Sequence, residues 1–201
     1  SGISTLLWVK ERYVPVEKRN RPKFWHSYQN LLSSSGLRRL YVLTFLRELV
    51  RALIFPFISL FIVTINNTEQ GAALATGILV GSTAIVGAFS ALWLGRLGDQ
   101  VGHQRILYLC ALVAMILYLP QPFITSAWHL IILQILSSIA VGGLIPSIAA
   151  LMNLWTLDQN QGIVYGLENS ITSAARIVAP ILGAAIAIWF GIRGVFVIAI
   201  L

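Results

Sequence analysis

Residues 106–157, ILYLCALVAMILYLPQPFITSAWHLIILQILSSIAVGGLIPSIAALMNLWTL, contain no Asp, Glu, Lys or Arg in 52 consecutive positions. A soluble domain is about 25% charged, so an uncharged segment of this length does not suit a water-exposed fold. A bilayer core about 30 Å thick takes roughly 20 residues of α-helix, and the segment is therefore long enough for two membrane spans. Pro120, Gln121 and Pro122 mark the turn between them. The segment predicts an all-α integral membrane protein.

The rest of the chain extends this pattern, since 57% of the residues are hydrophobic and the mean hydropathy is +0.82. Residues 1–9 are apolar, and we expect them to end a preceding transmembrane helix. Residues 10–39 form a polar linker. The transmembrane bundle is expected over residues 40–201, with spans at about 40–65, 71–95, 105–120, 128–154 and 162–190 and a truncated span from about 194. The pattern predicts an internal piece of a longer protein.

Aromatic and leucine residues recur at helical spacing within the linker: Phe24, Trp25, Tyr28, Leu31 and Leu32. Such a stripe on a polar segment fits an interfacial helix lying on the inner leaflet. A simple tether fits the same residues, and the sequence leaves both interpretations open.

Basic residues orient the chain in the membrane. Eight of the fourteen Lys and Arg lie in the linker, and two more flank residues 96–105. Cytoplasmic loops carry the excess of Lys and Arg, so the linker and the 96–105 loop are expected in the cytoplasm. We therefore expect the chain in a plasma membrane, namely a bacterial inner membrane. The net charge of +7 then reflects membrane orientation and not nucleic-acid binding. One cysteine, Cys110, excludes a disulfide framework within the chain.

A second informative stretch, 95-GRLGDQVGHQR-105, lies between two apolar runs. Glycine allows close approach and positive φ, so Gly95 and Gly102 are expected at the two corners of a short loop. Asp99 is placed to cap or face a helix N-terminus, and Arg105 to start the next helix at the inner surface.

The spacing G-x-L-x-D-x-x-G-x-x-R in this stretch resembles the cytoplasmic loop motif of the major facilitator superfamily of secondary transporters. The matching residues are Gly95, Leu97, Asp99, Gly102 and Arg105. Gln100 and His103 stand where that family usually has Lys or Arg. The missing basic residues resemble the second, less well preserved copy of the motif, which follows the eighth helix in that family. The segment 8-WVKERYVPVEKR-19 resembles the start of the central cytoplasmic linker of the family.

The resemblance implies a six-helix half-bundle, the C-terminal half of a twelve-helix transporter whose N-terminal half is its partner. Residues 175-ARIVAPILGAA-185 are similar to the helix-bending motif of drug:proton antiporters, with Pro180 and Gly183 as matches. Ala175, Ala179 and Ala184 replace glycines of that motif. The closest likeness is the multidrug-efflux branch, which implies export of apolar or cationic small molecules against proton entry, without a cofactor or metal. In that family the loop aspartate engages the opposite half, so Asp99 is expected to be unpaired here.

Charged side chains at membrane depth are costly and usually face a cavity or a partner. Residues three or four apart share a helix face, so two polar stripes are predicted to line one watery transport cavity. One stripe comprises Thr44, Glu48 and Arg51, with Arg47 beside it. The other comprises Tyr165, Glu168, Asn169, Thr172, Ser173 and Arg176. Alternatively, Arg47 snorkels to the inner surface and Glu48 with Arg51 is only a neutralising pair. Gln134 is a weaker cavity candidate.

Small residues predict close helix packing. Gly77 and Gly81 form G-x-x-x-G, and Gly87, Ala91 and Gly95 continue the spacing. Ser138 and Gly142 do the same on a later span.

Three other functions are compatible with parts of the sequence. The scaffold also serves proton-linked transport of a sugar, metabolite or siderophore. A non-transporting membrane subunit is a further alternative. An intramembrane enzyme is disfavoured, because the spans contain no Ser/His/Asp set, no H-E-x-x-H and no Cys or His at metal-ligand spacing.

Overall fold

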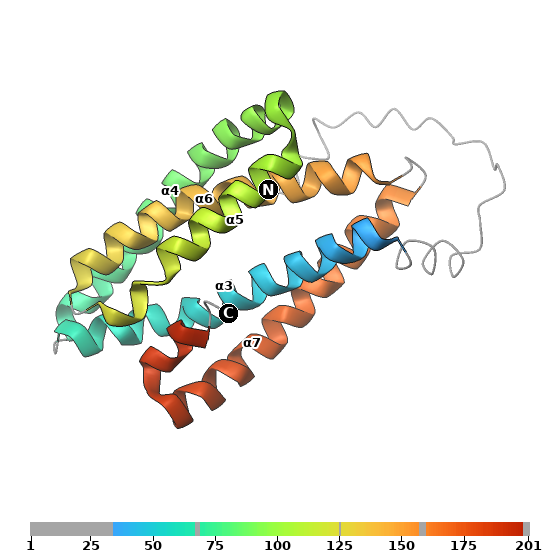
Figure 1. The fold of residues 1–201 in the computed structure, drawn as a ribbon. Coiled ribbons are helices and arrows are strands. Elements are labelled where there is room, and N and C mark those ends of the chain that lie inside the picture. Colours follow the sequence, from blue (N-terminus) through green and yellow to red (C-terminus); the bar gives the residue numbers. More distant parts are fainter. Residues whose placement is uncertain (1–33, 67–68, 125, 157–159, 199–201) are drawn as a thin grey trace, which may run out of the picture.

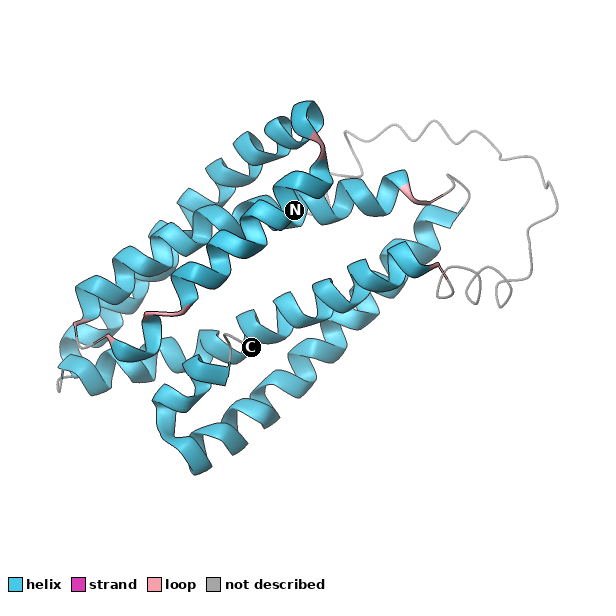
Figure 2. Ribbon diagram, viewed as in Figure 1, coloured by secondary structure: helices cyan, strands magenta, loops and turns pink. Residues whose placement is uncertain are grey.

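The computed structural model describes residues 34–66, 69–124, 126–156 and 160–198, and every element within these ranges is helical. The apolar segment 1–9 and the predicted interfacial helix lie outside the described residues. The elements, shown in Figure 2, are α3 (Ser35–Asn66), α4 (Glu69–Val101), α5 (His103–Tyr118), the 3-10 turn η1 (Gln121–Phe123), α6 (Ala127–Leu154) and α7 (Gln161–Ile198). The all-α fold class is confirmed.

The helices form two packed groups. α4 and α5 both pack against α6, and α3 packs along α7, as Figure 1 shows. Four segments of the described chain are long and apolar enough to cross a bilayer: Ala73–Val101, His103–Phe123, Ala127–Leu154 and Gln161–Gly191. α3 is as long as these but carries three charged residues near its middle.

The apolar core is divided into two main clusters at opposite ends of α3. One cluster contains Leu37, Leu40 and Tyr41 of α3, together with buried side chains of the other four α-helices. The other contains Ile54, Ile58, Phe61 and Ile62 of α3, with partners from α4, α6, α7 and the residue after η1. Between them, Thr44 and Glu48 are buried polar residues. The three charged residues near the middle of α3, Arg47, Glu48 and Arg51, thus lie between the two apolar clusters along the helix.

α4 and α6 approach each other through small residues. A methyl group added at Gly142 would lie 2.6 Å from the carbonyl oxygen of Gly87, and the Ser90 hydroxyl donates a hydrogen bond to the carbonyl of Ile139. Pro146 lies 3.5 Å from the position of an added Cβ at Gly95. The predicted close packing through residues 87, 95 and 142 is confirmed: a Cβ at Gly142 would clash with the backbone of α4, and Cβ atoms at Gly87 and Gly95 would lie in van der Waals contact with α6.

The G-x-x-x-G pair does not take part in this contact. No atom lies within 4 Å of a Cβ built at Gly77 or Gly81 in the described structure, and both residues are exposed. The close neighbour predicted for these two glycines is not found among the described residues.

Buried amides join α5, η1 and α6. The side chain of Gln121 is fully buried, and its Nε2 donates to the Ser137 hydroxyl at 3.3 Å. Nε2 of Gln134 donates to the side-chain Oε1 of Gln121 at 3.1 Å. Buried polar groups are stable only when hydrogen-bonded, so this network fixes the turn between the helices. Gln134 therefore belongs to a packing contact.

Candidate functional site

The site is built around Glu48, whose side chain is only 3% exposed in the middle of α3. Its Oε1 accepts a hydrogen bond from Arg176 Nε at 2.7 Å and another from Arg51 Nη1 at 3.4 Å. Oε2 accepts from Arg47 Nη2 at 3.4 Å. Three guanidinium groups from two helices therefore bind one buried carboxylate.

Small residues on α7 bring Arg176 to this carboxylate. Ala175 and Ala179 are completely buried, and Gly183 is so close to Phe57 of α3 that an added Cβ would lie 2.7 Å from the ring. Residues four apart share a helix face, so these three positions form the surface of α7 that contacts α3. Arg176 lies at the edge of this contact and reaches Glu48 across it.

The remaining charges of the cluster are Arg47 and Glu168. The Arg47 side chain is 17% exposed, and its Nε has no hydrogen-bond partner in the described structure. Glu168 of α7 is partly buried and interacts electrostatically with Arg47, but no ion pair within 4 Å is formed by its carboxylate among the described residues. Glu168 is thus the freer of the two carboxylates.

The rest of the predicted α7 stripe is mostly exposed. Tyr165 and Asn169 are exposed, whereas Thr172 is buried. The hydroxyl of Thr172 donates to the Asn169 carbonyl of the same helix at 3.0 Å. The structure therefore places Glu168, Asn169 and Tyr165 where a molecule beside α7 can contact them.

The predicted α3 stripe included the hydroxyl of Thr44, whereas Ser147 was not among the predicted cavity residues. Thr44 and Ser147 are fully buried, and neither hydroxyl has a hydrogen-bond partner in the described part of the chain. Thr44 precedes Glu48 by one turn of α3. Its free hydroxyl adds a polar group beside the buried carboxylate.

The predicted ten-residue loop is reduced to a single residue. α4 continues to Val101 and α5 begins at His103, because Gly102 adopts φ 101° and reverses the chain alone. Gly95 lies inside α4, so its predicted place at a loop corner is wrong. Leu97 packs on the first apolar cluster, and Arg105 lies exposed in the first turn of α5.

Asp99 has a different partner from the expected ones. Its Oδ1 lies 3.0 Å from Nε2 of His103, one turn further on, and no side chain caps the start of α5. The expectations that Asp99 caps a helix or stays unpaired are therefore wrong. The imidazole packs over Gly98, where an added Cβ would overlap it. His103 stands at a position where the resemblance leads one to expect Lys or Arg.

The helix-bending motif keeps helical backbone angles. α7 continues through Pro180 and Gly183, and its non-helical residue is Gly191, with φ 73° and ψ 175°. The chain turns back at this glycine, as the red end of the ribbon in Figure 1 shows. The break thus falls between the predicted span at 162–190 and the truncated span from about 194.

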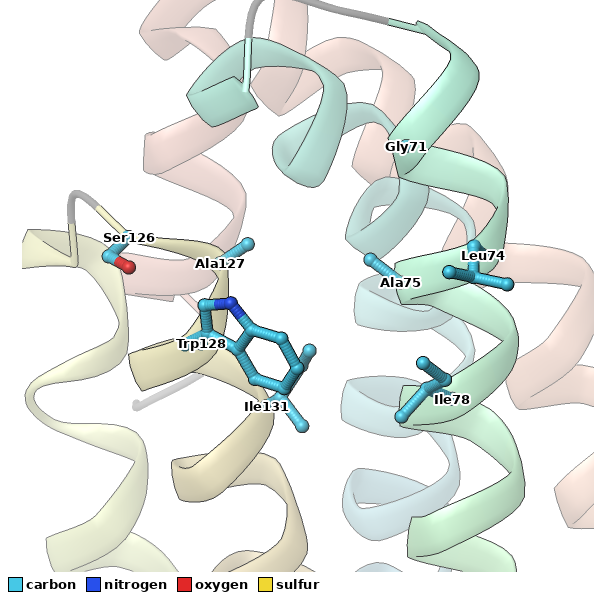
Figure 3. Close-up of a pocket in the computed structure, with 8 residues that line it drawn as sticks. All are labelled: Gly71, Leu74, Ala75, Ile78, Ser126, Ala127, Trp128 and Ile131. Atoms are coloured by element: carbon cyan, nitrogen blue, oxygen red, sulfur yellow. The ribbon is translucent and has the colours of Figure 1, made fainter.

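A cavity of about 190 Å³ lies between the starts of α4 and α6. None of the residues of the charged cluster lines it. Figure 3 shows that Trp128 and Ile131 of α6 face Leu74, Ala75 and Ile78 of α4 across it. Its lining is apolar apart from the Ser126 hydroxyl and the Trp128 indole nitrogen. It offers no charged group for substrate or proton binding.

Comparison with known proteins identifies the family of this chain. The sequence profile described as the Major Facilitator Superfamily matches residues 40–201. Multidrug resistance protein MdtG of Serratia proteamaculans is 28% identical over 199 residues, which is 99% of this chain and 48% of that protein. The protein of the same name from Erwinia billingiae is 28% identical over 196 residues, covering 98% of this chain and 48% of the relative.

A third relative with that name, from Salmonella paratyphi B, is 25% identical over 192 residues, or 96% of this chain and 48% of its own length. The chain spans about half the length of the curated relatives it matches. The family match, the apolar helices and the charged cluster agree with the resemblance carried by the 95–105 stretch. The protein is a multi-pass membrane protein that belongs to the Major Facilitator Superfamily.

Proposed function

We propose that this chain forms one half of a secondary transporter that exports small amphipathic, drug-like molecules in exchange for protons. The observation that carries the proposal is the polar cluster around Glu48, placed about 20 Å along both α3 and α7 in an otherwise apolar bundle. Transporters of this kind bind substrate near the bilayer midplane. Relatives named as multidrug resistance proteins support the drug-efflux class.

The exposed side of the cluster forms the wall of the proposed cavity. Arg51, Arg176, Asn169 and Tyr165 are exposed, and charged side chains at membrane depth face water or a partner rather than lipid. The rest of the full-length protein supplies the opposite wall.

The cytoplasmic turn at residues 95–105 is proposed to act as a gate. Asp99 is 73% exposed even while it contacts His103, so its carboxylate remains accessible to another part of the protein. A contact of Asp99 that forms in only one of two conformations would stabilise that conformation relative to the other.

Glu168 is the proposed proton-carrying group. Glu48 accepts hydrogen bonds from three guanidinium groups, whereas Glu168 has no ion pair within 4 Å among the described residues. A nearby cation favours the ionised form of a carboxyl group, so a proton carrier must not be held in a fixed ion pair. Glu168 also lies on the exposed stripe of α7, where protons and substrate both have access.

Replacing Glu168 with glutamine in the full-length protein is expected to abolish export driven by a pH gradient, because glutamine stays neutral. Exchange of labelled for unlabelled substrate across proteoliposomes, which needs no net proton movement, should continue. The control is Ser170→Ala, since the Ser170 hydroxyl bonds only to the Gly166 carbonyl of its own helix. Gradient-driven export at the parent rate in Glu168→Gln would remove Glu168 from proton coupling.

The proposed orientation places Gln100 in the cytoplasm and Phe123 on the outer side of a bacterial inner membrane. Both side chains are exposed, and Cys110 is buried, so the background thiol is shielded. Single cysteines at these positions in the full-length protein should react with an impermeant maleimide from opposite sides. Labelling of both in intact cells would contradict the assignment of the loops.

A further inference from the structure

The charge presented beside the buried carboxylate is positive. The side chains of Arg51 and Arg176 are 66% and 61% exposed, while that of Glu48 is 3% exposed. A molecule that approaches the cluster from its open side therefore meets guanidinium groups first. The Glu48 carboxylate lies behind them, so it is not free to bind a cation.

Both arginines retain unused hydrogen-bond donors. A guanidinium group has five N–H donors, and Arg176 uses Nε for Glu48 while Arg51 uses Nη1. No other hydrogen bond of these two side chains occurs in the part of the chain that the structure describes. Because both arginines contact Oε1 of Glu48, their guanidinium groups lie side by side with terminal nitrogens available.

The cluster as a whole carries one more positive than negative formal charge. Arg47, Arg51 and Arg176 carry three positive charges, and Glu48 and Glu168 supply two negative ones. An uncompensated charge at membrane depth is costly, and a ligand of opposite charge lowers that cost.

We infer that Arg51 and Arg176 form a binding site for the acidic group of an amphipathic organic anion, such as an aromatic sulfonate or carboxylate. Guanidinium groups bind such oxyanions through paired, charge-assisted hydrogen bonds. Phe55 lies one turn beyond Arg51 and is 58% exposed, which offers an apolar surface to the body of the ligand. The inference rests on the proposed export function, because it names the substrate class of the same cavity. An anionic substrate differs from the apolar or cationic substrates that the resemblance implies.

The test uses two dyes that share one scaffold, anilinonaphthalene sulfonate and phenylnaphthylamine, which lacks the sulfonate. Binding of each to the full-length protein in nanodiscs is measured by calorimetry, and export is measured in proteoliposomes under a pH gradient. The parent protein should bind the sulfonate more tightly than the neutral dye. Arg51→Gln should weaken sulfonate binding by roughly tenfold, the loss of a charged hydrogen-bonded contact, and leave the neutral dye unchanged.

Three variants distinguish a role of the Arg51 charge in binding from a structural role of Arg51. Glu48 keeps Arg47 and Arg176 in the Arg51→Gln protein, so the α3–α7 contact is preserved. Arg51→Lys, which keeps the charge, should retain part of the lost affinity. Arg38→Gln removes the same charge from an exposed site at the start of α3 and should change neither dye.

Equal weakening of both dyes by Arg51→Gln would overturn the inference and leave Arg51 a structural role. Preference of the parent protein for a lipophilic cation, tetraphenylphosphonium, over the sulfonate would overturn it as well. Arg51-dependent sulfonate binding without export of either dye would uphold the anion site and contradict the export function instead.

Discussion

Replacing Glu48 with alanine is expected to lower the free energy of unfolding of the full-length protein by about 3 kcal/mol. Breaking a buried ion pair by removing one partner costs about 3–5 kcal/mol, and we place this case at the lower end because two of the three arginines are exposed. The main loss falls on Arg47, which is largely buried and would keep only the distant charge of Glu168. Thermal unfolding in detergent, followed by size-exclusion fluorescence, measures the change.

Glu168→Ala is the matched control for this prediction. It removes the same functional group from a carboxylate that forms no ion pair within 4 Å among the described residues, so its cost should stay below about 1 kcal/mol. Equal destabilisation by the two substitutions would show that the ion pair between α3 and α7 does not hold the helices together.

Gly142→Ala is the substitution with the second largest expected effect. The added methyl would lie 2.6 Å from the carbonyl oxygen of Gly87 and 3.0 Å from Cβ of Ser90. A backbone oxygen has no rotamer through which to move away, so α4 and α6 must separate. Overpacking of this kind costs typically about 1–3 kcal/mol. The same unfolding assay reports the loss.

Gly81→Ala makes the same chemical change on α4 where a built Cβ meets no atom within 4 Å of the described structure. It should leave stability unchanged or raise it slightly, since alanine has the higher helix propensity. A Gly142→Ala protein as stable as the Gly81→Ala protein would contradict the α4–α6 contact.

The anion site changes how the substrate class is inferred. The charged residues of α3 and α7 include both signs, and from the sequence a carboxylate such as Glu48 is as available to a substrate as an arginine. In the fold, Glu48 is enclosed by guanidinium groups and the arginines keep the exposed positions. Burial therefore decides which charges a ligand can reach.

Amino-acid order by itself determined the all-α membrane fold and the family. These follow from local properties: a 52-residue uncharged run is too apolar for water, and the spacing of Gly95, Leu97, Asp99, Gly102 and Arg105 is read along one segment. The same is true of the candidate polar stripes, because helical periodicity places side chains on a face before any partner is known.

Tertiary structure alone decided which polar groups meet. Glu168 and Arg176 share a stripe on α7, yet Arg176 binds Glu48 of α3, because Ala175, Ala179 and Gly183 let the two helices approach. The glycines at 87 and 142 pack while those at 77 and 81 stay open, although their local sequences give the same signal. Contacts between helices depend on how two surfaces fit, and periodicity along one helix carries no information about the surface it will face.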